Sequence, residues 1–332
     1  MGELDLGHPA RERLAQGLLA WGQPRPDIPP DLVAALRGTL DEELAEFGEA
    51  LHEAARDARN GRLLVTKTSL DRLACDGLAR DPKPYEHTRA NVRGTLTHAV
   101  IERDWAEGRA RDAHEVVDAV WAHEASRRPG DPSSLSWWLN AQPPEAVSDL
   151  KHEVADLLAG YREVWPELPR ERVVARVERP VELALADGRV VLRGVPDLVL
   201  DSPVRDGRAR TLVVDLKTGR PRPEHDRHEL RFYALLVTLA TGRPPFRWAT
   251  YYVTEGRAEH EDLRVETLYA TVRRVSDGVR QQLRLAASAD DAGLTIRAGA
   301  WCAFCARESW CEEAAAARAR HGLSHPDDTM TP

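Results

Sequence analysis

The sequence predicts an α/β protein in which a central mixed β-sheet is flanked by helices on both faces. The chain reads as helical to about residue 165, becomes β-rich at Arg172, and then alternates helix, strand and helix to about residue 286. Because helices and sheets must bury their apolar sides against another layer, this order favours helices packed on a sheet. A chain of 332 residues can enclose one or two such cores.

The N-terminal region is predicted to be helical. Residues 1–60 are rich in Ala, Leu, Glu and Arg, and a break at Gln23–Pro30 separates a short helix from a longer one. Asp31 caps the longer helix, which extends to about Arg59.

Further helical segments follow. The polar run Thr66–Ser69 precedes periodically spaced leucines, which predicts a helix start. Gly94 to about Ala106 forms another helix, with an apolar face made by Leu96, Val100 and Ile101. Residues 107–165 are helical and interrupted by loops at Arg128–Ser134 and Gln142–Pro144.

The β-rich region begins with two short strands, Val173–Val177 and Val181–Leu185. The pair Asp187-Gly188 is a strong hairpin signal, so Val190–Leu200 is predicted as the return strand. The remaining predicted elements are a strand at Leu212–Lys217, a helix at 226–241, a strand at Phe246–Val253 and a helix at about Glu266–Ala286.

Composition places the chain among ordinary globular proteins, with 42% hydrophobic and 30% charged residues. The sequence has no run of about 18 apolar residues, and Met1 to Ala20 has no apolar signal-peptide core. We therefore expect a cytoplasmic protein without a membrane partner.

The net charge of −8 argues against an indiscriminate polyanion binder. It does not exclude a nuclease, because a metal-binding pocket is acidic and DNA needs only a local basic surface. Six arginines that bracket Asp215 suggest such a surface: Arg205, Arg208, Arg210, Arg220, Arg222 and Arg227. A chance grouping is the alternative, because arginine is the predominant basic residue throughout the chain.

Two carboxylates and a lysine form the main candidate site. Side chains alternate across a strand, so Asp215 and Lys217 point to one face while Leu216 points into the core. The preceding strand could bring Asp197 beside Asp215, within bridging distance of one cation. Carboxylate oxygens with open water positions suit Mg²⁺ or Mn²⁺.

Two features raise the significance of this pattern. Asp215 interrupts an apolar strand, where an unpaired carboxylate would be costly. Lysine occurs only at Lys67, Lys83, Lys151 and Lys217, in a chain that otherwise uses arginine. A compact ammonium at this position fits a role in catalysis, although an exposed cross-strand ion pair would also explain an isolated acid-x-lysine pattern.

The ordered motifs resemble the PD-(D/E)xK superfamily. They are Gly94-x-x-x-His98, Gly194-x-x-Asp197, Asp215-x-Lys217 and Glu229-x-x-x-Tyr233. The set is similar to the branch that contains the RecB and AddB nuclease domains and the CRISPR-associated RecB-like exonucleases, over roughly residues 68–312. The resemblance implies a restriction-endonuclease-like core and metal-dependent hydrolysis of phosphodiester bonds in DNA.

The resemblance also implies residue roles. His98, Asp197, Asp215 and the backbone carbonyl of Leu216 would hold the metal, and Lys217 would orient or deprotonate the attacking water and offset charge on phosphorus. Three residues would bind substrate or support the site: Glu229, Tyr233 and Glu102. Glu229 departs from the family pattern, which normally has glutamine there.

Four cysteines form a second candidate site. Cys302, Cys305 and Cys311 have the spacing C-x2-C-x5-C, and Cys75 precedes them by more than two hundred residues. Four thiolates in a cytoplasmic chain favour zinc or an iron–sulfur cluster over disulfides, and the spacing does not separate the two metals. The same family branch has members with this cysteine arrangement that bind a four-iron four-sulfur (4Fe–4S) cluster. That resemblance implies a structural cluster shielded by Trp301, Phe304 and Trp310.

The sequence lacks a G-x4-G-K-S/T phosphate loop, so a helicase partner in trans would supply any unwinding. The expected substrate is DNA, single-stranded or with free ends, in repair, recombination or defence, and exonuclease action is favoured. The alternatives are a non-cleaving DNA-binding scaffold subunit of a helicase–nuclease complex and a zinc-stapled domain of unrelated chemistry.

The expected organisation has three segments. A helical extension occupies 1–60, and the nuclease domain occupies 61–312, with a helical insertion at about 107–165 and cluster cysteines at both ends. A C-terminal helix and a disordered tail occupy 313–332.

Overall fold

The protein is represented by a computed structural model, which describes residues 7–127, 130–288, 290–291 and 293–321. The tail predicted from Ser324 onward lies outside these residues. Contacts divide the chain into two compact units. Unit 1 contains the chain up to Ala35, Glu86–Val181 and Gly194–Leu268, and unit 2 contains Leu36–Tyr85, Glu182–Arg193 and the chain from Tyr269. The three segments expected from the sequence, 1–60, 61–312 and 313–332, are defined along the chain rather than by contacts, and they remain a prediction.

Unit 1 is built on a five-stranded sheet with the order β2-β5-β6-β7-β8. The strands are β2 (Val174–Val177), β5 (Leu198–Asp201), β6 (Thr211–Lys217), β7 (Pro245–Tyr252) and β8 (Arg257–Asp262). The β6–β7 pair is parallel and the other pairs are antiparallel, so the predicted mixed sheet is confirmed.

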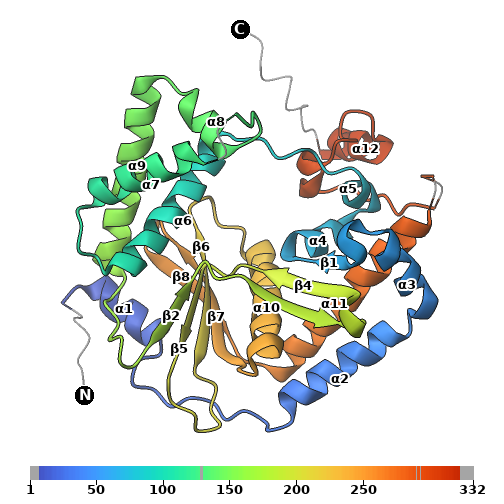
Figure 1. Ribbon diagram of the computed structural model, residues 1–332, viewed down its shortest axis with the longest axis horizontal. Coiled ribbons are helices and arrows are strands. Elements are labelled where there is room, and N and C mark those ends of the chain that lie inside the picture. The colour runs from blue at the N-terminus through green and yellow to red at the C-terminus, as the bar shows by residue number, and fades with distance from the viewer. Residues whose placement is uncertain (1–6, 128–129, 289, 292, 322–332) are drawn as a thin grey trace. The chain divides into compact units, whose positions relative to one another are not determined.

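Helices of unit 1 cover both faces of this sheet, as predicted (Figure 1). One face carries α1 (Pro9–Gly17), α6 (Arg89–Glu107), α7 (Ala113–Ser126), α8 (Leu135–Asn140) and α9 (Pro144–Val164). The other face carries α10 (Pro223–Thr241). The predicted α/β class is therefore confirmed.

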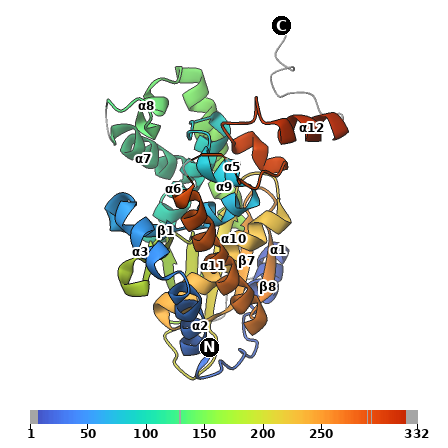
Figure 2. The ribbon, with the colours of Figure 1, turned by 90° about the vertical axis from the view of Figure 1, so that its right-hand side faces the viewer.

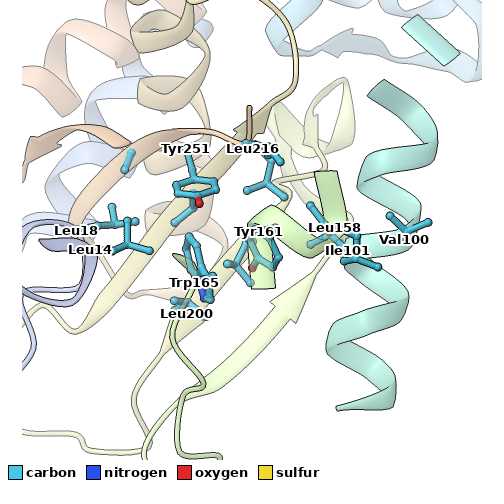
Figure 3. Close-up of a cluster of buried hydrophobic side chains, with 14 of the residues drawn as sticks. Leu14, Leu18, Val100, Ile101, Leu158, Tyr161, Trp165, Leu200, Leu216 and Tyr251 are labelled. Atoms are coloured by element: carbon cyan, nitrogen blue, oxygen red, sulfur yellow. The ribbon is translucent and has the colours of Figure 1, made fainter. Parts of the chain in front are cut away.

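The core of unit 1 lies between the sheet and α6, α7 and α9, and it is rich in aromatic rings (Figure 3). Tyr161 stacks on Trp165 with ring centroids 5.4 Å apart, and Tyr251 meets Trp165 edge-on at 5.2 Å. Leu216 of β6 belongs to the same buried cluster. Because side chains alternate along a strand, Asp215 and Lys217 face the opposite side of the sheet, where α10 lies.

Unit 2 has a smaller sheet with the order β1-β4-β3. Its strands are β1 (Leu63–Val65), β3 (Val181–Leu185) and β4 (Val190–Gly194), and β1 pairs with β4 in parallel. Its helices are α2 (Leu32–Ala45), α3 (Gly48–Asp57), α4 (Lys67–Asp71), α5 (Asp76–Arg80), α11 (Val265–Ala287) and α12 (Glu312–His321). Four 3-10 helices complete the described elements, at Arg59–Gly61, Arg72–Ala74, Ala186–Gly188 and Ala300–Phe304.

The helix α11, orange in Figure 2, contacts the residue before α3 and the strand β1 within unit 2. The Arg280 guanidinium lies 5.4 Å from the centroid of the Phe47 ring, and Gln282 Nε2 donates to the carbonyl of Leu64 at 3.2 Å. No helix in the described ranges is both long and apolar enough to cross a membrane.

Helix starts follow side-chain capping. The predicted start at Thr66–Ser69 is confirmed, because each of these two side chains accepts from the backbone N–H of the other. The helix predicted from Gly94 begins earlier, at Arg89, because Thr88 and Asn91 form a second reciprocal cap. The sequence prediction overlooked this cap.

Two predicted elements are each divided in the structure. The helix expected from Asp31 to Arg59 is separate helices, α2 and α3, because Gly48 turns the chain with a φ of +46°. The return strand expected at Val190–Leu200 is β4 and β5, which join different sheets. Pro196 lies in the break, since proline has no N–H to offer a sheet.

Gly194 lies against Tyr233, and this close approach predicts a stability effect. A Cβ at residue 194 would lie 2.6 Å from Tyr233 Cε1 and 3.1 Å from Leu236 Cδ2, both of which are buried. We expect Gly194→Ala to reduce the free energy of unfolding by about 1–3 kcal/mol, as overpacking does. Urea denaturation followed by circular dichroism measures this change.

Gly160 in α9 is the matched control, because a Cβ there has no atom within 4 Å. Gly160→Ala should leave stability unchanged or raise it by up to about 1 kcal/mol. Equal urea midpoints for Gly194→Ala and the wild type would contradict the packing argument.

Candidate active site

The candidate site lies where β5 and β6 run side by side in unit 1. The two strands are antiparallel, with Leu198 opposite Val214, so Asp197 lies opposite Asp215 as predicted. The Asp197 Oδ2 atom accepts a hydrogen bond from the backbone N–H of Leu216 at 2.5 Å. Asp215 is 1% exposed and Asp197 is 7% exposed, so both carboxylates are removed from bulk solvent.

His98 brings α6 to this pair of carboxylates. Its Nδ1 lies 3.4 Å from Asp197 Oδ1 and 3.2 Å from Glu178 Oε1. Burial would lower the pKa of His98, but the two neighbouring carboxylates outweigh it and raise the pKa to about 10. The imidazole is therefore held by two acids, and in the absence of a cation it stays protonated at neutral pH.

Glu178 is a site residue that the sequence reasoning missed. It follows β2, and its backbone N–H donates to the carbonyl of Asp197 at 3.0 Å. Its φ of +48° is uncommon for a residue other than glycine, and such strain is typical of functional positions. Burial raises the pKa of Glu178, and the nearby Asp197 raises it further, while His98 lowers it.

A signal for Glu178 was present in the sequence. Val177 pairs with Leu198 in the antiparallel β2–β5 ladder, so Glu178, which follows Val177, meets Asp197, which precedes Leu198. An acidic residue directly after the predicted strand at 173–177 would have been found by pairing that strand with β5.

Lys217 lies between two carboxylates. Its Nζ is 2.8 Å from Asp215 Oδ2 and 2.6 Å from Glu229 Oε2 on α10. Burial would lower the pKa of Lys217, but Asp215 and Glu229 outweigh it and raise the pKa. The structure therefore places Glu229 as a partner of Lys217, with His225 Nε2 on its other oxygen at 3.5 Å.

The other predicted support residues lie on the same helices. Tyr233, one turn after Glu229 on α10, is 3% exposed and packs against Gly194. Glu102, one turn after His98 on α6, is exposed, and it acts on Glu178 by charge alone, raising its pKa. The side chain of Leu216 is buried in the core, and this burial fixes the position of the backbone whose carbonyl was expected to hold the metal.

The six arginines expected to form one basic surface around Asp215 are divided between the two ends of β6. Arg205, Arg208 and Arg210 precede the strand, and the other three follow it. Seven residues of extended strand separate the groups by about 20 Å, since each residue advances about 3.3 Å. That expectation was wrong, because closeness along an extended strand is not closeness in space.

The donor atoms suit a divalent cation. His98, Glu178 and Asp197 each offer a ligand atom, and these three atoms lie within 4.8 Å of one another. Four carboxylates (Glu178, Asp197, Asp215 and Glu229) face Lys217 and protonated His98, so these six side chains carry four negative and two positive charges. A divalent cation that displaced the His98 proton would change the net charge of this group from −2 to −1, so it would offset half of the excess.

The four cysteines converge in unit 2. Cys75 and Cys305 are buried together with Leu78, and the pKa of Cys305 is raised by burial and by proximity to the other three thiols. Backbone N–H groups point at two sulfurs, from Arg297 to Cys75 at 3.5 Å and from Gly299 to Cys302 at 3.4 Å.

The aromatic residues expected to shield this site behave differently from one another. Trp301 is partly buried and packs on the cysteine cluster. Phe304 and Trp310 are 61% and 63% exposed, so the shielding expected of them was wrong. Phe304 ends the 3-10 helix Ala300–Phe304, and there its backbone carbonyl, which accepts from Lys83 N–H at 2.9 Å, makes the contact with the neighbouring segment. The Trp310 ring lies 5.3 Å from the Arg307 guanidinium.

Comparison with known proteins identifies a family. Residues 72–312 match the family described as the PD-(D/E)XK nuclease superfamily. Among solved structures, the chain is similar to one described as "Crystal structure of SSO0001", with 15% sequence identity, a TM-score of 0.31, and coverage of 81% of this chain and 96% of that one. No curated protein matches the chain.

The protonated state of His98 predicts that metal affinity depends on pH. A metal ligand must be neutral imidazole, so binding at His98 displaces a proton whenever the pH is below the pKa of about 10. Between pH 6.5 and 8.5 the apparent affinity for Mn²⁺ should rise about tenfold per pH unit. Isothermal titration calorimetry in buffers of different ionisation enthalpy also counts the released proton.

The slope should be lost in His98→Gln and kept in His152→Gln, whose histidine lies on α9 and bonds to the Ser148 carbonyl. A His98→Gln protein with the wild-type slope would contradict the assignment of the proton to His98.

Proposed function

The chain belongs to the PD-(D/E)XK nuclease superfamily, and we propose that it hydrolyses DNA with a divalent metal ion held by His98, Asp197 and Asp215. We further propose that Glu178 contributes a fourth side chain to this metal site. The observation that carries the proposal is the convergence of His98, Glu178 and Asp197 next to the Asp215–Lys217 pair.

The arrangement of Asp197 supports the metal site in detail. Its Oδ2 is held by the Leu216 N–H, and its Oδ1 faces His98. One oxygen therefore fixes the carboxylate, and the other is directed at the remaining donors. Hydrogen bonds that orient a ligating carboxylate are typical of protein metal sites.

The metal, when bound, would polarise the scissile phosphate and lower the pKa of an attacking water. Lys217 would orient that water and offset the negative charge that develops on phosphorus. Because Asp215 and Glu229 raise the pKa of Lys217, its ammonium is poorly suited to deprotonate the water. Of the two roles considered for Lys217, charge stabilisation is therefore favoured.

The substrate and its context are part of the proposal. The order of the four motifs supports a RecB- or AddB-like nuclease that acts on single strands or free ends of DNA. The missing phosphate loop supports a helicase partner in trans where unwinding is required. Repair, recombination and defence are the processes that need such a nuclease.

We also propose that the four cysteines bind a 4Fe–4S cluster. The donor set fits, because four thiolates are the ligands of such a cluster. The C-x2-C-x5-C spacing with Cys75 upstream is similar to that of family members that bind this cluster, and this similarity supports the cluster over zinc.

The nuclease proposal predicts the effect of two substitutions. Asp215→Asn removes a metal ligand, and Lys217→Ala removes the cation beside it, so each should lower the cleavage rate by at least about 100-fold. Single- and double-stranded DNA labelled at the 5′ or 3′ end, incubated with Mn²⁺, measures the rate. Release of short products from one end would show exonuclease action and its polarity.

Two controls sharpen this experiment. Asp118→Asn changes an exposed carboxylate that pairs with Lys151, and it should cut at the wild-type rate. Glu229→Gln keeps an oxygen that accepts from Lys217, so activity should stay within about tenfold of wild type. A wild-type protein that binds every substrate without cutting it would instead support a scaffold role.

The cluster proposal predicts a coloured protein. Anaerobically purified protein should absorb broadly near 400 nm with about four irons per chain, and Cys311→Ser should lose both signals. Ser309→Ala, at a neighbouring exposed residue, should keep them. Stoichiometric zinc in a colourless anaerobic preparation would contradict the proposal.

A further inference from the structure

Unit 1 has a large cavity at the end of the sheet where β6 begins. Its volume is about 810 Å³, within the usual range for small-molecule sites. Leu200 and Leu212 form part of its apolar wall, together with Leu168 and Val173. The candidate active site is at the other end of β6, about 20 Å away along the strand.

Aromatic rings and guanidinium groups line the same cavity. The Arg25 guanidinium lies 4.0 Å from the centroid of the Phe246 ring, and Arg172 lies 5.4 Å from that of Trp21. Planar guanidinium groups stacked on rings present flat surfaces to a ligand.

Two of the three lining arginines lack a carboxylate partner in the described part of the chain. Arg25 donates to the carbonyls of Leu19 and Ala20, and Arg172 makes only its ring contact with Trp21. Arg210, in contrast, forms a bidentate pair with Asp206. Burial lowers the pKa of Arg25, and the charges of Arg210 and Arg247 lower it further.

Within the described ranges, no acidic side chain that lines the cavity pairs with Arg25 or Arg172. The buried Asp201 accepts from Thr211 Oγ1 at 3.1 Å and pairs with Arg243. Glu171, the other acidic lining residue, is exposed. The cavity thus has a positive rim and an apolar, aromatic interior.

We infer that this cavity binds a nucleotide, with its base against the apolar wall and its phosphate on Arg25 and Arg172. Guanidinium groups recognise phosphate through paired hydrogen bonds, and bases stack on aromatic and guanidinium planes. The nucleotide could be free or part of a DNA strand, since the chemistry is the same. The inference does not depend on the proposed nuclease activity.

Binding to the full-length protein in EDTA tests this inference separately from cleavage. The probes are dTMP, dAMP, inorganic phosphate and an unstructured oligothymidylate, measured by calorimetry. A nucleotide unit, free or in the strand, should bind at least about tenfold more tightly than phosphate, because only the nucleotide contacts the apolar wall.

Arg172 is the preferred position to change, because its side chain is exposed and forms no hydrogen bond in the described chain. Arg172→Gln should weaken nucleotide binding about tenfold, and Arg172→Lys should recover part of it. Val204→Trp, at a 48% exposed lining residue, should block the cavity without affecting folding. Arg127→Gln, at an exposed arginine on another surface of unit 1, is the matched control.

The outcomes are distinct. Binding of dTMP or dAMP that both cavity variants weaken supports a free-nucleotide site, and weakening confined to the oligonucleotide supports a strand-binding site. Phosphate bound as tightly as nucleotide, or affinities unchanged in Arg172→Gln and Val204→Trp, would overturn the inference. Each of these binding results can occur whether or not the protein cuts DNA, so this experiment does not test the proposed nuclease function.

Discussion

The hydrogen bond from the Leu216 N–H to Asp197 ties the candidate active site to the core of unit 1. The Leu216 side chain is buried among the core aromatic rings, so the peptide that donates this bond is fixed. A one-residue slip of β6 would turn Lys217 into that core and Leu216 out of it, which burial strongly opposes. The register that packs the core therefore also places Asp215 opposite Asp197.

Charge burial is the second constraint. Asp197, Asp215 and Glu229 are all less than a tenth exposed, and a buried carboxylate is tolerated only with compensating partners. Lys217 compensates Asp215 and Glu229 by lying between them. Protonated His98 compensates two carboxylates, those of Asp197 and Glu178. A cation that replaced the His98 proton would also stabilise the folded chain, since binding to the native state alone adds to its stability.

The sequence was sufficient for features set by short-range periodicity. Alternation along β6 placed Asp215 and Lys217 on one face, and the motif order associated His98 with Asp197, which it contacts. Glu178 was missed because its position depends on β2 pairing with β5, about twenty residues away, rather than with its neighbour in the chain. The edge strand β8 was missed because its residues, Arg257–Asp262, are almost all polar and carry no apolar alternation.

The six arginines that bracket Asp215 in the sequence do not form one basic surface around it, because the energy between two charges depends on their distance in space. Arg205, Arg208 and Arg210 are at the far end of β6 from Lys217, about 20 Å away, and salt at physiological strength screens exposed charges over about 8 Å. These arginines therefore cannot balance the carboxylates of the candidate active site, and compensation there has to be local. Because of the same separation, the carboxylates of the candidate active site do not neutralise the positive rim around Arg25 and Arg172. The two ends of β6 therefore lie in surroundings of opposite charge, and each can bind a different ligand.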